Sequence, residues 1–294
     1  MFYRRKVILA LLQIFNDELD KIHFQKLLFL FTKKQKKTVY DFIPYKFGCF
    51  SYSAYADVNA MVKREFLTET DTKIIKKDPI DYIEQLKKED EEILRQIKSE
   101  YGNKSVSAVL KQTYIEYPYY AIKSEVAEER LSYKEFERVK EAIPHGNRTT
   151  LFTLGYEGIS IEAYLNKLIK NDIKLLIDVR KNAQSMKYGF SKSRLKNYCE
   201  SLGIDYIHIP EVGIETNKRV KLETFEDYQK LFEDYKRSNL LRTVEQQKTI
   251  LNLLSKYERI ALTCFEANPD YCHRKHLAES VSGLPGFNFE IKHI

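Results

Sequence analysis

One short segment of the chain, residues 264–274 (CFEANPDYCHR), gathers many reactive side chains. It directly follows the apolar run at 259–263 (RIALT), which predicts a buried strand. Thiol, carboxylate, imidazole and guanidinium groups serve in acid–base, nucleophilic and anion-binding chemistry. A strand that opens into all four groups predicts the edge of an active site.

Two other apolar runs in the same half also end in polar groups. The run at 152–154 leads into residues 155–158 (GYEG), where two glycines would let the backbone approach a ligand and the next helix would offer its N-terminus to an anion. The run at 175–177 leads into Asp178 and Arg180, a pair that suits a phosphate or carboxylate held by the arginine. A tight turn and a structural ion pair are equally compatible with these two segments.

Together these strand ends and nearby loops define a candidate site. The candidate catalytic residues are Glu266, Asp178, Cys272 and His273. The candidates for binding a ligand or a phosphate are Gly155, Tyr156, Glu157, Gly158, Arg180, Tyr188, Lys192, Glu211 and Arg274.

The residue types leave the chemistry of this site open. In a hydrolytic reaction at a nucleotide or nucleic acid, Glu266 or Asp178 would activate water or stabilise positive charge at a sugar carbon. Arg180 and Arg274 would hold phosphate, and aromatic residues would stack on a base. Alternatively, Cys272 would be a nucleophile whose thiol pKa is lowered by its cationic neighbours and a helix N-terminus.

A metal site is a further possibility in this segment. Cys264, Cys272, His273 and His276 are ligand types for zinc. Their spacing matches no zinc-finger pattern, however, and adjacent residues seldom both ligate one ion. We therefore assign no metal ligand and expect no cofactor. In the plainest interpretation the cysteines are small buried residues and His273 is a hydrogen-bonded structural histidine.

The sequence after residue 150 predicts the elements that position this site. Short apolar runs alternate with amphipathic helices, which indicates a Rossmann-like, mostly parallel sheet with flanking helices. Ligands of such sheets bind beyond the C-terminal strand ends, where the candidate residues lie. The predicted strands cover 152–154, 174–177, 205–209 and 259–263, and the predicted helices cover 161–170, 192–202, 225–236, 242–257 and 272–280.

The sequence before residue 145 has a different pattern. Apolar residues recur at spacings of three and four, which predicts a smaller, mainly α-helical domain with helices near 7–15, 24–31, 55–66, 83–97 and 105–120. Residues 44–51 predict an aromatic turn, with Ser51 or Ser53 as a helix cap. Pro144 and Gly146 interrupt the periodicity, so we predict domains at 1–145 and 150–294.

Composition and charge limit the class of protein. With 294 residues, 43% hydrophobic and 31% charged, the chain is typical of a globular protein with room for two cores. No apolar run has the length of a membrane span, no signal-peptide pattern is visible, and four irregularly spaced cysteines do not form a disulfide framework. We therefore expect a cytoplasmic protein without a membrane partner.

The net charge of +7 is concentrated at the front of the chain, where residues 1–50 hold ten Lys or Arg against four Asp or Glu. A basic cluster is typical of a nucleic-acid-binding surface, although a solvated Lys-rich face is an equally good interpretation. The candidate nucleic-acid-binding residues are Lys33, Lys34, Lys36 and Lys37.

The second half resembles the bacterial and archaeal family called domain of unknown function 488. The matching stretches keep the family's order and cover roughly residues 150–283: TLGYEG (153–158), LIDVR (176–180), YGFSK (188–192), GIDYIHIPEVG (203–213) and CFEANPDYCHR (264–274). Because the family is defined by its unknown function, the resemblance implies no reaction.

The first half resembles, more loosely, the helical domain of the SocA-like antitoxin (Panacea) group. The residues that carry this resemblance are QKLLFL (25–30), YKFGCFS (45–51) and YAD (55–57). Such domains look like helical adaptors or winged-helix relatives, which implies contact with DNA or with a protein.

The function favoured by these patterns is a nucleic-acid- or nucleotide-directed enzyme, hydrolytic in type, with an N-terminal module that binds DNA, RNA or a protein partner. This pairing of domains suits genome defence or DNA processing. The alternative is a non-catalytic sensor that binds a small anionic ligand in the α/β domain and contacts DNA or a partner through the helical domain.

Overall fold

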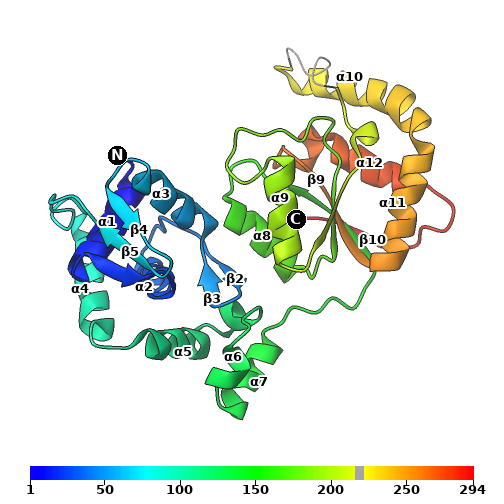
Figure 1. Ribbon diagram of the computed structural model, residues 1–294. Coiled ribbons are helices and arrows are strands. Elements are labelled where there is room, and N and C mark those ends of the chain that lie inside the picture. Colours follow the sequence, from blue (N-terminus) through cyan, green and yellow to red (C-terminus); the bar gives the residue numbers. More distant parts are fainter. Residues whose placement is uncertain (216–221) are drawn as a thin grey trace. The chain divides into compact units, whose positions relative to one another are not determined.

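The computed structural model describes residues 1–215 and 222–294. The chain forms two compact units, Met1–Ile143 and Pro144–Ile294 (Figure 1). Within the described residues, no helix is both long enough and apolar enough to cross a membrane.

The first unit is mainly helical, as its apolar spacing predicts. Its helices are α1 (Tyr3–Ile14), α2 (Lys21–Lys34), α3 (Tyr52–Val62), α4 (Lys88–Tyr101), α5 (Val106–Glu116), α6 (Ala127–Arg130) and α7 (Tyr133–Glu141), with a 3-10 turn, η1 (Pro118–Ala121), between α5 and α6. Its short strands are β1 (Glu18–Asp20), β4 (Leu67–Glu69) and β5 (Lys73–Lys76), in the antiparallel order β1-β5-β4, and the hairpin β2 (Ile43–Tyr45) and β3 (Gly48–Phe50).

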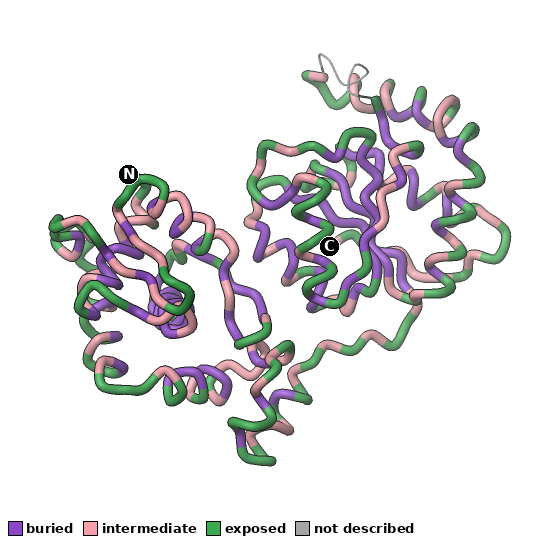
Figure 2. Tube along the Cα trace, in the orientation of Figure 1, coloured by how far each residue is buried: buried purple, intermediate pink, exposed green. Residues whose placement is uncertain are grey.

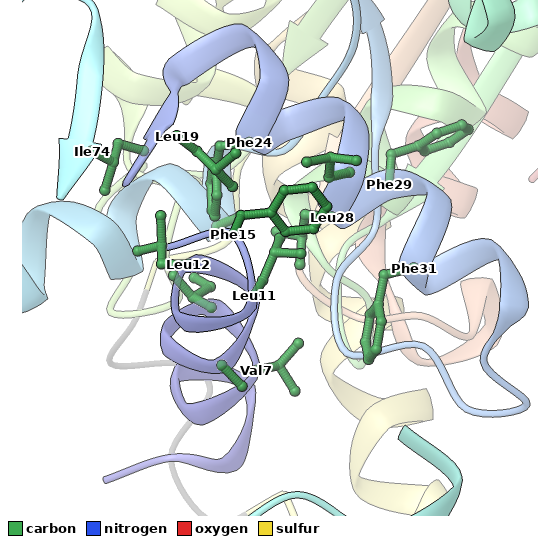
Figure 3. Close-up of a cluster of buried hydrophobic side chains, with 14 of the residues drawn as sticks. Val7, Leu11, Leu12, Phe15, Leu19, Phe24, Leu28, Phe29, Phe31 and Ile74 are labelled. Carbon is green, nitrogen blue, oxygen red and sulfur yellow. The ribbon is translucent and has the colours of Figure 1, made fainter. Parts of the chain in front are cut away.

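The core of this unit lies around α1 and α2. Both helices bury long continuous stretches, residues 7–12 in α1 and 23–32 in α2, as expected for central helices surrounded by other elements. Figure 3 shows Val7 and Leu11 of α1 in one hydrophobic cluster with Phe24 and Leu28 of α2. Full burial of each such side chain is worth about 1.5–3 kcal/mol.

The segment predicted as an aromatic turn is a β-hairpin. It is tied to α2 by two buried hydrogen bonds, from Lys26 Nζ to the Cys49 carbonyl (2.7 Å) and from the Ser51 amide to Gln25 Oε1 (3.0 Å). Ser51 then caps α3 by accepting a hydrogen bond from the Ala54 amide, which confirms one of the two predicted caps. The prediction failed to find the hairpin because its strands have only three residues each.

The second unit is a five-stranded, fully parallel sheet with flanking helices, which confirms the predicted fold class. The strands are β6 (Thr150–Gly155), β7 (Leu175–Asp178), β8 (Asp205–His208), β9 (Arg259–Cys264) and β10 (Glu290–His293), in the order β10-β6-β9-β7-β8. The helices are α8 (Ile161–Lys170), α9 (Lys192–Ser201), α10 (Phe225–Tyr235), α11 (Val244–Tyr257) and α12 (His273–Ser282). Strand β10 was not predicted, because charged residues alternate with apolar ones along this edge strand.

The sheet is buried by helices on both faces. Figure 1 shows α8 and α9 on one side of the sheet and α11 and α12 on the other. The central strands β6, β7 and β9 are buried almost throughout, as the colouring of Figure 2 shows. Such continuous burial explains why these strands appear in the sequence as mostly apolar runs without a regular polar alternation.

This topology creates a switch point between neighbouring strands β6 and β9. The chain leaves β6 through α8 on one face and leaves β9 through α12 on the other (Figure 1). In open α/β sheets the crevice beyond the strand ends at such a point is the usual ligand site. The segments that follow β6 and β9 are residues 155–158 and 264–274, so the fold places both predicted segments at this point.

At this point the two strand ends pack so closely that only glycine fits at residue 155. A Cβ added to Gly155 would overlap the backbone carbonyl of Glu266. We expect Gly155→Ala to lower the free energy of unfolding of the second unit by about 1–3 kcal/mol, as overpacking does. Urea denaturation measures this change.

The matched control is Gly283→Ala at the C-terminal end of α12. There the nearest atom to the added Cβ would be the Ser280 carbonyl oxygen at 3.4 Å, an ordinary contact, so stability should be unchanged or slightly higher. Equal effects of the two substitutions would contradict the close packing of the strand ends.

Candidate functional site

A buried ion pair connects the ends of β7, β8 and β6. Arg180 donates from Nε to Asp178 Oδ1 (2.8 Å) and from Nη2 to Asp178 Oδ2 (2.5 Å), a two-bond geometry that fixes both side chains. Tyr206 of β8 donates its hydroxyl to Asp178 Oδ2 (2.6 Å). Arg180 Nη1 donates to the Tyr156 hydroxyl (2.7 Å) and to the Phe190 carbonyl (2.9 Å).

The environment keeps the Arg180 guanidinium charged although it is buried. The Asp178 side chain is 0% exposed and that of Arg180 is 6% exposed. Burial by itself lowers the pKa of Arg180, but the hydrogen bonds and the charge of Asp178 outweigh burial and raise the pKa above its ordinary value. Because at least four of the five guanidinium donors are used internally, Arg180 acts here as a scaffold and has little left to offer a phosphate.

A second set of hydrogen bonds joins the end of β6 to the loop after β9. The backbone amides of Tyr156 and Glu157 both donate to the Phe265 carbonyl, at 3.0 and 2.9 Å. The Glu157 carboxylate in turn accepts from the Ala267 amide (3.0 Å). The exposed face of the switch point is therefore lined by Glu157 and the partly exposed Glu266.

Arg274 forms hydrogen bonds with two backbone carbonyls of this loop. Its guanidinium donates from Nη1 to the Glu266 carbonyl (2.5 Å) and from Nη2 to the Ala267 carbonyl (2.9 Å). The residue is 1% exposed, and its Nε is buried without a hydrogen-bond partner among the described residues. Arg274, like Arg180, therefore positions backbone in this structure.

The thiols of Cys264 and Cys272 lie close to the imidazole of His273, in the buried part of this edge. Cys264 ends β9, Cys272 caps α12 and His273 begins that helix, and all three are buried. His273 Nδ1 lies 3.6 Å from Cys264 Sγ and 3.9 Å from Cys272 Sγ, while its Nε2 lies 3.1 Å from the Val179 carbonyl. Cys264 Sγ also donates to Glu266 Oε2 (3.2 Å).

This cluster does not have the properties expected of an activated cysteine. Burial raises the pKa of the Cys272 thiol well above its ordinary value, in the opposite direction to the lowering that the nucleophile hypothesis requires. His276, the other candidate ligand, lies apart from the cluster. Its ring packs on Phe232 at a centroid distance of 4.6 Å, and its Nδ1 lies 3.2 Å from Glu279 Oε2.

The remaining predicted ligand residues lie on separate loops around this edge. Tyr188 is 38% exposed and has the Arg194 guanidinium over its ring at 5.4 Å. Lys192 begins α9 and is exposed, and Glu211 is exposed in the turn after β8. Gly158 has a left-handed φ of 74°, which the turn before α8 requires.

Sequence reasoning did not include Tyr206 or Lys187 in the site. Tyr206 and His208 share one face of β8 by alternation; Tyr206 reaches Asp178, and His208 Nε2 lies 2.8 Å from the Arg180 carbonyl. Their shared face was the signal that could have placed them beside Asp178. Lys187 donates from Nζ to the Tyr156 carbonyl (2.6 Å), and no spacing pattern in the loop predicts that contact.

In the first unit, the four candidate lysines are exposed around the end of α2. Two of them pair with acids, Lys34 with Glu100 (3.0 Å) and Lys36 with Glu89 (3.6 Å). Lys33 lies over aromatic rings, 4.9 Å from the centroid of Tyr120. This surface is therefore of mixed charge, and less basic than its sequence indicates.

The second unit is thus a doubly wound α/β domain with its candidate site at the switch point. Residues 160–281 match the family model described as domain of unknown function DUF488, which supports the resemblance seen in this half of the chain. No curated protein matches the chain. The resemblance of the first unit to the SocA-like group stays a prediction.

The buried ion pair predicts a large effect of neutralising its acid. Asp178→Asn would leave the buried Arg180 charge without its partner, so we expect the second unit to lose about 3–5 kcal/mol of unfolding free energy. Denaturant unfolding measures this loss.

The control is Glu200→Gln, which removes the acid of the exposed pair Lys196–Glu200 on α9, whose side chains are 49% and 48% exposed. Removing one partner of such a surface pair should cost about 0–1 kcal/mol. A small effect of Asp178→Asn would show that the ion pair does not hold the strand ends together.

Proposed function

We propose that the second unit hydrolyses a nucleotide or nucleic acid at the switch point between β6 and β9, with Glu266 as the group that activates water. The observation that carries this proposal is the set of hydrogen bonds that links the ends of β6, β7, β8 and β9 into one edge, which bears the exposed Glu157 and the partly exposed Glu266. Rigid placement of a carboxylate is what general base catalysis requires.

We assign the roles of Glu266, Asp178 and Arg180 from the exposure of each residue. Glu266 is partly exposed, its backbone carbonyl accepts from Arg274, and its Oε2 accepts from Cys264 Sγ, so both its backbone and its carboxylate have defined partners. Asp178 and Arg180 are buried and bonded to each other, which suits positioning rather than contact with substrate. We therefore assign the chemistry to Glu266.

Substrate phosphate would be bound by the loop between β7 and α9. Lys187 is partly buried there, with its ammonium beside the Tyr156 carbonyl, and burial lowers its pKa. Lys192 is exposed at the start of α9. Phe265 is 42% exposed and packs edge-on against Tyr156 at 5.3 Å, so its ring is available for stacking on a base.

The first unit would bind nucleic acid or a protein partner in this proposal. Support comes from its exposed lysines at the end of α2, beside a pocket of about 430 Å³ lined by Lys34, Lys36, Lys37, Lys87, Glu89, Asp90, Glu92, Ile93 and Gln96. Because acidic residues share this pocket, the binding is expected to be weaker than the number of lysines alone indicates.

Hydrolysis is tested with the full chain on a panel of nucleotides, NAD, and single- and double-stranded nucleic acids. Glu266→Gln keeps the size of the side chain but removes its basicity, so we expect turnover to fall by about 10²–10⁴-fold while the fold is retained. Circular dichroism and the unfolding midpoint check the fold.

The control variant is Glu245→Gln in α11, whose side chain is 80% exposed. It should hydrolyse the substrate like the wild type. Full turnover by Glu266→Gln would remove Glu266 from the reaction. Ligand binding without any turnover by the wild-type chain would instead support the non-catalytic sensor.

Nucleic-acid binding is tested by changing Lys33, Lys34, Lys36 and Lys37 together to Gln. We expect weaker binding and a shallower dependence of affinity on salt, by about 0.9 in the logarithmic slope for each lysine that contacts a phosphate. Fluorescence anisotropy over a range of salt concentrations measures both.

The matched control changes four exposed lysines elsewhere on the same unit, Lys63, Lys77, Lys111 and Lys134, to Gln. Both variants lose the same charge, so a general electrostatic effect would weaken both equally. Equal weakening, or binding that does not depend on salt, would contradict a binding surface at the end of α2.

A further inference from the structure

The buried cluster of Cys264, Cys272 and His273 has the composition of a metal site. One ligand atom from each residue can be chosen such that all three lie within 4.8 Å of one another. The residues come from two elements: Cys264 ends β9, while Cys272 and His273 begin α12. All three are at most 2% exposed, so the donor atoms are held by the packed core.

The two distances from the histidine nitrogen to the sulfurs are close to those between ligands of one tetrahedral ion. With Zn–S near 2.3 Å and Zn–N near 2.0–2.1 Å, a sulfur and a nitrogen on the same zinc lie about 3.6 Å apart. The two observed distances from His273 Nδ1 to the thiol sulfurs are 3.6 and 3.9 Å.

The backbone explains how two adjacent residues face the same point. Cys272 is the N-cap of α12 and has extended backbone angles, φ −134° and ψ 134°, whereas His273 is the first helical residue. The chain therefore changes direction between them, and both side chains turn towards the end of β9. This change of direction removes the objection that adjacent residues seldom ligate one ion.

The orientation of His273 is the one that metal-binding histidines adopt. Its Nε2 lies 3.1 Å from the Val179 carbonyl, an acceptor only, so Nε2 carries the proton and donates it. In the neutral ring the lone pair is then on Nδ1, which faces the two sulfurs. A backbone carbonyl bonded to the far ring nitrogen is a common second partner of metal-bound histidine.

The surroundings favour a metal over a disulfide. Two thiols that only formed a disulfide would not need an imidazole nitrogen directed at both of them. A zinc ion with two thiolates is neutral, so the bound cluster would bury little net charge. Soft thiolate together with imidazole is a donor set that selects zinc.

We infer that Cys264, Cys272 and His273 bind one zinc ion, with its fourth position facing Glu266. The Glu266 carboxylate lies next to the cluster, with Oε2 3.2 Å from Cys264 Sγ. Binding displaces the two thiol protons to solvent, and a water molecule completes the coordination. Two cysteines and a histidine around an open position, beside a carboxylate that is not a ligand, form a pattern found in hydrolytic zinc sites.

The ion's use in hydrolysis rests on the proposed function, but its binding does not. In that use the metal lowers the pKa of its bound water and Glu266 accepts the proton. Metal content and turnover are therefore measured separately, so that one can fail without the other.

The test of binding uses the full chain, purified without chelator and under reducing conditions. Elemental analysis should find about one zinc per chain. Replacement by Co²⁺ should give the visible ligand-field bands of a tetrahedral site and a thiolate-to-cobalt charge-transfer band. These wild-type measurements do not depend on whether any variant folds. No bound zinc together with no cobalt spectrum after metal is supplied would overturn the inference.

Variants then identify the ligands. Cys264→Ser, Cys272→Ser and His273→Gln should each lose most of the zinc and the thiolate-to-cobalt band, whereas Cys199→Ser, a matched change at a buried cysteine of α9, should keep both. Equal metal content in all four variants would place the ion elsewhere. Glu266→Gln should keep the zinc. If it keeps zinc and also full turnover, the proposed function fails while the metal site stands.

Discussion

The buried ion pair between Asp178 and Arg180 is the interaction on which the edge of the second unit depends. It bonds to Tyr156 after β6 and to Tyr206 of β8, so three strand ends meet on one pair of charges. Burying two charges is costly unless their hydrogen bonds are satisfied, and here the pair is satisfied almost completely. The same completeness leaves the pair few groups to offer a ligand, and we therefore propose the neighbouring loop as the place of the chemistry.

That loop is shaped by its contacts with β6. The Phe265 carbonyl accepts two amides from the end of β6, Glu157 returns a bond to the loop, and Arg274 holds two of the loop's carbonyls. The glycine at 155 is required because the Glu266 carbonyl occupies the space of a side chain. These contacts fix the backbone at Glu266, next to the thiols of Cys264 and Cys272.

The sequence predicted the sheet well because its central strands are buried on both faces and so appear as mostly apolar runs. It predicted for the same reason that the candidate residues gather at one place, since polar residues that follow buried parallel strands must meet at one edge. Strand β10 and the β2–β3 hairpin were missed, because an alternating edge strand and three-residue strands give weak local signals. The roles of individual residues were harder to predict. Arg180 has the positive charge expected of a phosphate-binding residue, but only the three-dimensional structure shows that its donors are already used in hydrogen bonds.

The cysteines illustrate the same limit. Spacing along the chain argued against a common ion for Cys272 and His273, yet the turn of the backbone at the start of α12 brings both towards Cys264. The most direct test of this edge as a reactive centre is anomalous diffraction at the zinc absorption edge from crystals of the full chain. The proposed site predicts one anomalous peak about 2.0–2.3 Å from both sulfurs and from His273 Nδ1, with the Glu266 carboxylate facing its open side. Continuous density between the two sulfurs, or no peak at this place, would contradict it.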